Sequence, residues 1–148
     1  MGKTFTQSKG RNRRGWWGRA IARVLLGAAL AFAGVSHLTT ARETFQAQVP
    51  TWLPLDPDFV VVASGVVEIA LGLALVALPR FQRWVGLVVA LFFIAIFPGN
   101  INQYVNGIDA FGLDTDTARL IRLFFQPLLV LWALWSTRAW GVWRRDRP

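Results

Sequence analysis

The stretch that decides the fold reads VVVASGVVEIALGLALVAL, residues 60–78, and it is apolar except at Ser64 and Glu68. A transmembrane helix needs about 20 mainly apolar residues, and this stretch reaches that length when Phe59 is added. An amphipathic helix of a soluble bundle would have a charged or polar face, whereas here one carboxylate interrupts the run. We therefore predict a membrane-spanning helix with Glu68 near its middle.

Three further apolar stretches have the same character, at about residues 23–38, 84–97 and 120–135. Charged residues make up 16% of the 148-residue chain, whereas soluble domains contain about 25%. The sequence therefore predicts an all-α fold, a four-transmembrane-helix bundle. The predicted helices cover about 21–40, 58–78, 83–101 and 118–137. They form one membrane domain, 20–138, between a disordered basic tail at 1–19 and a second basic tail at 139–148.

The basic residues predict the orientation of this bundle. Most of the 16 Lys and Arg residues lie before the first span, between the second and third, or after the fourth. By the positive-inside rule these segments face the cytoplasm. We therefore expect a multi-pass protein of the plasma (inner) membrane with both termini cytoplasmic. Attraction to anionic lipid headgroups accounts for the net charge of +8, and no nucleic-acid partner is expected because no recognition motif accompanies the charge.

The N-terminal region has an alternative interpretation as a cleavable signal peptide. It combines a basic start, an apolar stretch and the small-residue pattern Ala31-Phe32-Ala33. The apolar pattern continues beyond this site to Leu38, and cleavage would leave three spans. The uncleaved helix is therefore the preferred interpretation.

Composition also limits the chemistry that the chain can perform by itself. The sequence contains no Cys, one His and one Met. It therefore has no thiolate nucleophile and no thiolate-ligated metal centre, and a bis-His haem cannot form within one chain. No metal site is predicted and no catalytic residue is assigned. Redox chemistry would need an organic cofactor or a partner subunit.

Polar side chains within the predicted spans indicate a pocket. At helical spacing Ser64 and Glu68 share a stripe with small residues, which mark the faces where membrane helices approach closely. Glu68 is therefore predicted to face the bundle interior. At about 1.5 Å per residue, it and the other polar residues of the spans fall in the outer half of the bundle. The predicted pocket residues are His37, Ser64, Glu68, Asn100, Arg122 and Gln126. The predicted helix-packing residues are Gly27, Gly34, Gly65 and Gly72.

Each pocket residue also has a structural alternative. Glu68 is expected to meet Arg122, directly or through water, or else His37. Equally, it could be a protonated acid that links two helices. His37 could be a polar anchor at the membrane interface, and Asn100 could satisfy backbone groups that Pro98 leaves free.

The outer loops contain recognisable helix signals. Asp56-Pro57-Asp58 predicts a helix start, with a capping carboxylate followed by proline in the first turn. Asp114, Thr115 and Asp116 predict the cap of the last helix. Pro98 and Gly99 are expected to break or kink the third helix, so that Asn102, Gln103 and Asn106 would be solvated loop residues. Arg119 is expected to anchor lipid headgroups.

Four segments, in order, read AGVSHL (33–38), VPTWLP (49–54), SGVVEIALGLAL (64–75) and FPGNINQY (97–104). Their order and spacing resemble the DoxX family of small four-helix membrane proteins. That family is expected to have the patterns Gly-x-x-His, Ser/Thr-Gly-x-x-Glu and Phe-Pro-Ala-Asn. The resemblance covers about residues 20–138, and Gly99 here replaces the expected Ala. The matching positions are Gly34, His37, Gly65, Glu68, Pro98 and Asn100.

The resemblance implies a redox-associated or accessory role, because the family is named after a subunit of a thiosulfate:quinone oxidoreductase. We therefore expect an accessory membrane subunit whose pocket around Glu68 binds a small amphipathic ligand, with quinone as the candidate cofactor, or a partner helix. The alternatives are an electron-transfer subunit of a quinone-linked oxidoreductase and an assembly factor for other membrane proteins. A stand-alone enzyme is less expected. The expected partners are the lipid bilayer, a membrane or periplasmic subunit, and a second copy of the chain.

Overall fold

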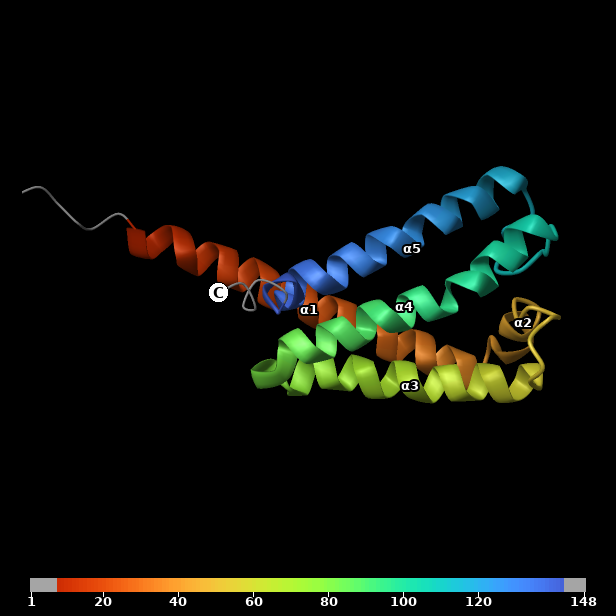
Figure 1. The fold of residues 1–148 in the computed structure, drawn as a ribbon, viewed down its shortest axis with the longest axis horizontal. Coiled ribbons are helices and arrows are strands. Elements are labelled where there is room, and N and C mark those ends of the chain that lie inside the picture. The colour runs from red at the N-terminus through yellow and green to blue at the C-terminus, as the bar shows by residue number, and fades with distance from the viewer. Residues whose placement is uncertain (1–7, 143–148) are drawn as a thin grey trace, which may run out of the picture.

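The structure, a computed structural model, describes residues 8–142 and is all-helical over that range. Four of its helices are long and apolar enough to cross a membrane, the pattern of a multi-pass membrane protein (Figure 1). These are α1 (Ser8–Leu38), α3 (Pro57–Ala77), α4 (Gln82–Val105) and α5 (Asp116–Thr137). The short helix α2 (Arg42–Gln46) precedes α3, and the 3-10 turns η1 (Pro79–Phe81) and η2 (Ala139–Gly141) follow α3 and α5.

Two of the predicted helix starts are confirmed. The Asp56 carboxylate accepts a hydrogen bond from the Phe59 N–H at 3.0 Å, and Pro57 occupies the first turn of α3. The Thr115 hydroxyl accepts one from the Ala118 N–H at 3.2 Å and begins α5. Both side chains satisfy a backbone donor that has no partner within the helix.

The first helix is longer than predicted. Disorder was expected up to residue 19, yet α1 begins at Ser8, so the prediction was wrong for residues 8–19. Each residue added to an existing helix gains one hydrogen bond without a new nucleation step, so the apolar span extends the helix into the polar residues before it. This part of α1 projects beyond the other helices (Figure 1). The rest of the two predicted tails, residues 1–7 and 143–148, lies outside the described residues.

Helix α4 also continues past its predicted end. It was expected to end near residue 101, with a break or a kink at Pro98, but it runs on to Val105 with Pro98 inside it. The turns after Pro98 are held by buried amide side chains. Asn100 donates to Gln126, and Gln103 donates to carbonyl groups of the following loop. The second loop therefore spans residues 106–115.

The four helices form two close pairs, α1 with α3 and α4 with α5 (Figure 1). Within the first pair the four predicted packing glycines face one another, Gly27 against Gly72 and Gly34 against Gly65. A Cβ atom on Gly34 would lie 2.5 Å from the Gly65 carbonyl oxygen, which real side chains do not allow. In the second pair, Gly86 lies directly against the Thr137 side chain, a contact that was not predicted.

The core joins the two pairs near η1 and η2. It consists of Leu26, Leu30, Leu75, Val89, Ala90, Phe93 and Ala133. The Trp132 indole N–H adds a bond to the Ala22 carbonyl at 3.0 Å. Many outward side chains are large and apolar, including Phe124, Leu128 and Leu131, which is consistent with contact to a lipid bilayer. Because lipid is as apolar as these side chains, close packing and hydrogen bonds hold such helices together.

The bundle has two different ends, here called the tail end and the loop end (Figure 1). The tail end carries η1 and η2, and α1 projects from it. The loop end carries α2 and the connecting residues 39–56 and 106–115. The described chain both starts and finishes at the tail end, as an even number of spans requires.

Candidate functional site

A cavity of about 430 Å³ lies at the loop end and is lined by all four long helices. Its volume is within the range of small-molecule sites, roughly 300–1,000 Å³. The core residues Leu26, Leu30 and Phe93 form its floor. The six predicted pocket residues all line it: His37 from α1, Ser64 and Glu68 from α3, Asn100 from α4, and Arg122 and Gln126 from α5.

A close polar contact in this cavity joins His37 to Glu68. The His37 Nδ1 atom lies 2.7 Å from the Glu68 Oε2 atom, and the two residues are only 7% and 4% exposed. The two groups are not aligned as a hydrogen bond, and within residues 8–142 neither atom has another partner. An imidazole and a carboxyl group this close can exchange a proton. Both residues line the cavity.

Arg122 and His37 were the two expected partners of Glu68, and the contact is with His37. Arg122 was expected to reach the carboxylate, but its guanidinium donates to the Gln126 side-chain oxygen at 3.3 Å instead. His37 reaches Glu68 because α1 and α3 touch at Gly65, where a Cβ would lie 2.9 Å from the His37 Cβ. The close contact between α1 and α3 therefore makes His37 the neighbour of Glu68.

Gln126 organises the opposite wall of the cavity. Its side-chain oxygen accepts from Asn100 at 3.1 Å as well as from Arg122, and its side-chain nitrogen donates to the Phe93 carbonyl at 2.7 Å. Asn100 and Gln126 are 5% and 1% exposed. These bonds join α4 to α5 inside the bundle. The Ser64 hydroxyl donates to Val61 of its own helix at 2.9 Å, which leaves its oxygen free to accept.

Residues 39–56, here called the covering segment, close one side of the cavity. Its Gln48, Val49, Pro50, Trp52 and Leu53 line the cavity, together with Phe45 of α2. The Phe45 ring lies edge-on to the His37 ring at a centroid distance of 3.5 Å, and the centroid of the Phe111 ring lies 4.5 Å from that of Phe45. The imidazole is thus held between Glu68 and an aromatic ring.

Polar contacts fasten the covering segment at two places. Near its start Arg42 and Gln46 each bind the Asp58 carboxylate at 2.6 Å. The hydrogen bond and the charge of Asp58 raise the pKa of the Arg42 guanidinium above its ordinary value. Near its middle the Gln48 amide donates to the Gln103 side-chain oxygen at 2.7 Å. The segment is therefore attached to both α3 and α4.

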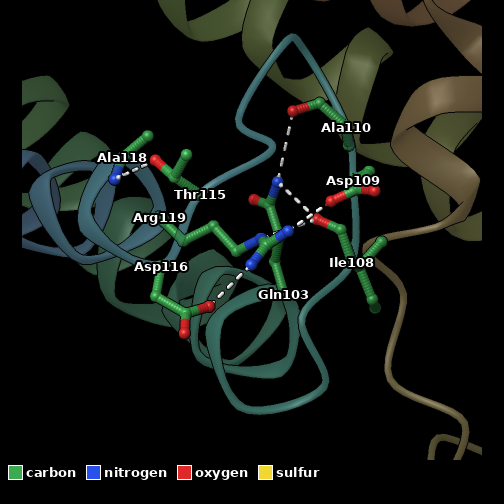
Figure 2. Close-up of polar contacts among 8 residues, drawn as sticks. All are labelled: Gln103, Ile108, Asp109, Ala110, Thr115, Asp116, Ala118 and Arg119. Carbon is green, nitrogen blue, oxygen red and sulfur yellow. Dashed lines mark hydrogen bonds and ion pairs between the residues drawn. The ribbon is translucent and has the colours of Figure 1, made fainter.

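The loop from 106 to 115 is held by Arg119, as Figure 2 shows. Arg119 donates to Asp116 at 2.7 Å, to the Ile108 carbonyl at 3.3 Å, and to Asp109. Gln103 donates to the Ile108 and Ala110 carbonyls, each at 3.4 Å. The loop thus lies across the ends of α4 and α5.

Two expectations for these residues were wrong. Arg119 was expected to anchor lipid headgroups, but it is only 6% exposed and bound to its own loop. Gln103 was expected to be solvated, but it is 1% exposed. It follows Asn100 by three residues, so it lies on the same face of the extended helix. That spacing would have identified it if α4 had been continued past Pro98.

Among residues 8–142 no group of three or more His, Asp or Glu side chains could hold a metal ion. Residues 26–137 match the model of a protein family described as a domain of unknown function, DUF8561. All residues that line the cavity fall within this match. No curated protein and no solved structure matches the chain.

Proposed function

We propose that this chain, which belongs to the DUF8561 family, is an accessory membrane protein that binds one small amphipathic molecule at its loop end. The observation that carries the proposal is the cavity itself, which collects His37, Glu68 and the polar groups around Gln126 between helices of membrane-spanning length. Ionisable groups within a bilayer are costly and are retained where they serve a site.

The walls of the cavity suit an amphipathic ligand. The lining is mostly apolar, with polar groups confined to the two clusters around Glu68 and Gln126. Small-molecule sites are built this way, because apolar walls supply affinity and a few placed polar groups supply orientation. The covering segment would shield one side of a ligand in the cavity.

We further propose that the loop end faces outward from the inner membrane and that both termini are cytoplasmic. Support comes from the distribution of basic residues, which favours the tail end on the cytoplasmic side. The ligand would then enter from the outer leaflet or from the compartment outside it.

The test compares ligand content in two tryptophan variants. Ala33 lines the cavity, whereas Ala28 is exposed on the same helix outside it. The protein is extracted with its native lipids, and bound molecules are identified by native mass spectrometry. We expect a bound small molecule in the wild type and in Ala28→Trp, and its loss in Ala33→Trp. Equal content in both variants, or a wild type without any bound molecule, would exclude the proposal.

The contact between His37 and Glu68 favours a second candidate, an electron-transfer subunit that acts on quinone. Reduction of a quinone to a quinol takes up two protons with two electrons, and these side chains are placed to handle protons. The cavity also offers hydrogen-bond donors for quinone carbonyls. The electrons would come from a partner subunit, because the chain has no Cys for an iron–sulfur centre.

This candidate is tested with decylubiquinone and membranes that contain the partner proteins. Donor-dependent quinone reduction should require the chain, and Glu68→Gln should change its pH dependence while Arg80→Gln, at the exposed tail end, should not. Equal reduction by membranes that lack the chain would rule out the redox role without affecting the binding proposal.

A further inference from the structure

Arg122 lines the cavity and has no carboxylate partner among residues 8–142. Within residues 8–142, Arg42 forms an ion pair with Asp58 and Arg119 with two aspartates, and the Glu68 carboxyl group lies against His37. Arg122 has only the 3.3 Å hydrogen bond to the neutral Gln126 side chain. Arg119, one turn earlier on the same helix, thus takes both neighbouring carboxylates, and the charge of Arg122 remains uncompensated.

The direction of the Arg122 side chain distinguishes it from an interfacial anchor. Helix α5 runs from the loop end to the tail end, so Gln126 lies one turn deeper in the bundle than Arg122. Side chains of a helix lean towards its N-terminus, and a snorkelling arginine would extend that way, towards the loop end. The Arg122 guanidinium instead reaches inward to Gln126, and it lines the cavity.

We propose that the ligand of this cavity has an acidic head group, a carboxylate or a phosphate, which pairs with Arg122. This inference rests on the proposed binding function and narrows it to acidic amphiphiles. Gln126 uses one of the five N–H donors of the guanidinium, and the remaining donors form a fork that matches the oxygens of such a head group. The amide of Asn100, held beside it by Gln126, lies in the same part of the cavity.

Other head groups fit these residues less well. A cationic group would need a free carboxylate, but His37 already lies against Glu68. A neutral group would leave the guanidinium without a counter-charge in a largely apolar cavity. With the acidic group at Arg122, the apolar part of the ligand would lie against Leu26, Leu30 and Phe93 at the floor of the cavity.

The test uses probes that share one chain and differ in the head group. The protein is placed in phosphatidylcholine nanodiscs, and binding of dodecanoate, dodecyl phosphate, dodecanol, decylubiquinone and inorganic phosphate is measured by native mass spectrometry and by the shift in melting temperature. We expect either acidic probe to bind at least 10-fold more tightly than dodecanol. Arg122→Gln should weaken acidic binding roughly 10-fold to 100-fold and weaken dodecanol binding by a much smaller factor.

Arg80→Gln is the matched control, because it removes the same charge from an exposed site at the tail end. Arg80→Gln should prefer the acidic probes over dodecanol as strongly as the wild type does. Arg122→Lys should keep part of this preference, because lysine retains the positive charge but lacks the planar fork of donors. Dodecanol or decylubiquinone binding as tightly as the acidic probes would overturn the inference and leave the binding function standing. An unchanged preference in Arg122→Gln, or inorganic phosphate binding as tightly as dodecyl phosphate, would also overturn it. Binding of no probe would defeat the inference together with the proposed function.

Discussion

His37 of α1 and Glu68 of α3 meet with 2.7 Å between Nδ1 and Oε2, beside the place where Gly34 faces Gly65. The contact between His37 and Glu68 depends on the close approach of the two glycines. A Cβ on Gly65 would lie 2.9 Å from both the Gly34 carbonyl oxygen and the His37 Cβ. Without the glycines α1 would stand further from α3, and the imidazole would no longer reach the carboxyl group. Helix packing therefore determines the polar site.

Gly65→Ala is expected to destabilise the bundle, because its Cβ would contact backbone that can move only by separating the two helices. Overpacking of this kind costs about 1–3 kcal/mol. Chemical denaturation in mixed micelles would measure the loss. Gly18→Ala is the control, since nothing lies within 4 Å of its Cβ position and alanine favours the helix. Equal stability of Gly65→Ala and the wild type would contradict this prediction.

The contact between His37 and Glu68 should appear as a coupling in a double-mutant cycle. His37→Leu or Glu68→Leu alone leaves a buried polar partner without its neighbour, whereas the double variant removes both. We expect a coupling free energy of roughly 0.5–3 kcal/mol from the unfolding of the four proteins. The matching cycle of Glu68 with Arg122 should be additive within about 0.5 kcal/mol. A larger coupling in the Arg122 cycle would show that the pairing is assigned wrongly.

Arg119→Gln should release the loop of residues 106–115. The substitution removes bonds to two aspartates and to the Ile108 carbonyl, at a cost of about 1–3 kcal/mol. Faster hydrogen exchange of these residues is the measurement. Arg119→Lys should restore little of the protection of the loop from hydrogen exchange, because an ammonium group lacks the planar fork of donors. The control is Asp114→Asn, because Asp114 is an exposed loop residue with no hydrogen bond among the described residues. In this variant, residues 106–115 should exchange hydrogen at the wild-type rate. Unchanged exchange in Arg119→Gln would argue against the anchoring role.

Gln48→Ala should loosen the covering segment, because the buried Gln103 side-chain oxygen loses its donor. The expected loss of stability is about 1 kcal/mol, with faster hydrogen exchange at residues 39–56 and faster release of any bound ligand. Asn106→Ala is the comparison, since Asn106 is exposed and, within the described part of the chain, its side chain bonds only to Asn102. If exchange at residues 39–56 is the same in both variants, the Gln48 bond does not hold the segment.

The proposed orientation can be tested by labelling single introduced cysteines. The chain has no Cys of its own, so no native thiol has to be replaced first. Thr51 lies exposed in the covering segment, and Arg80 lies exposed at the tail end. A membrane-impermeant thiol reagent should label Thr51→Cys in intact cells and label Arg80→Cys only after permeabilisation. The reverse pattern would place the termini outside and the cavity on the cytoplasmic side.

Much of the candidate site follows from local patterns. Glu68 and Gly72 lie one turn apart on a stripe of small residues, which predicts that the carboxyl group faces another helix. The starts of α3 and α5 were predictable for the same reason, since a cap depends on three or four consecutive residues. Gln103 was missed because its burial depends on whether α4 continues past Pro98. The helix continues through contacts with α5 and with the 106–115 loop.

The sequence by itself determined the four spans, the starts of α3 and α5, and the inward faces of the six predicted pocket residues, because each depends on residues within a few turns of one helix. Only the tertiary structure decided which charges meet. Glu68 lies against His37 because four glycines bring α1 onto α3. Arg119 rather than Arg122 meets Asp109 because the 106–115 loop folds over the start of α5. Which charged side chains meet depends on how closely segments far apart in the chain approach one another. The periodicity of a single helix does not encode these distances.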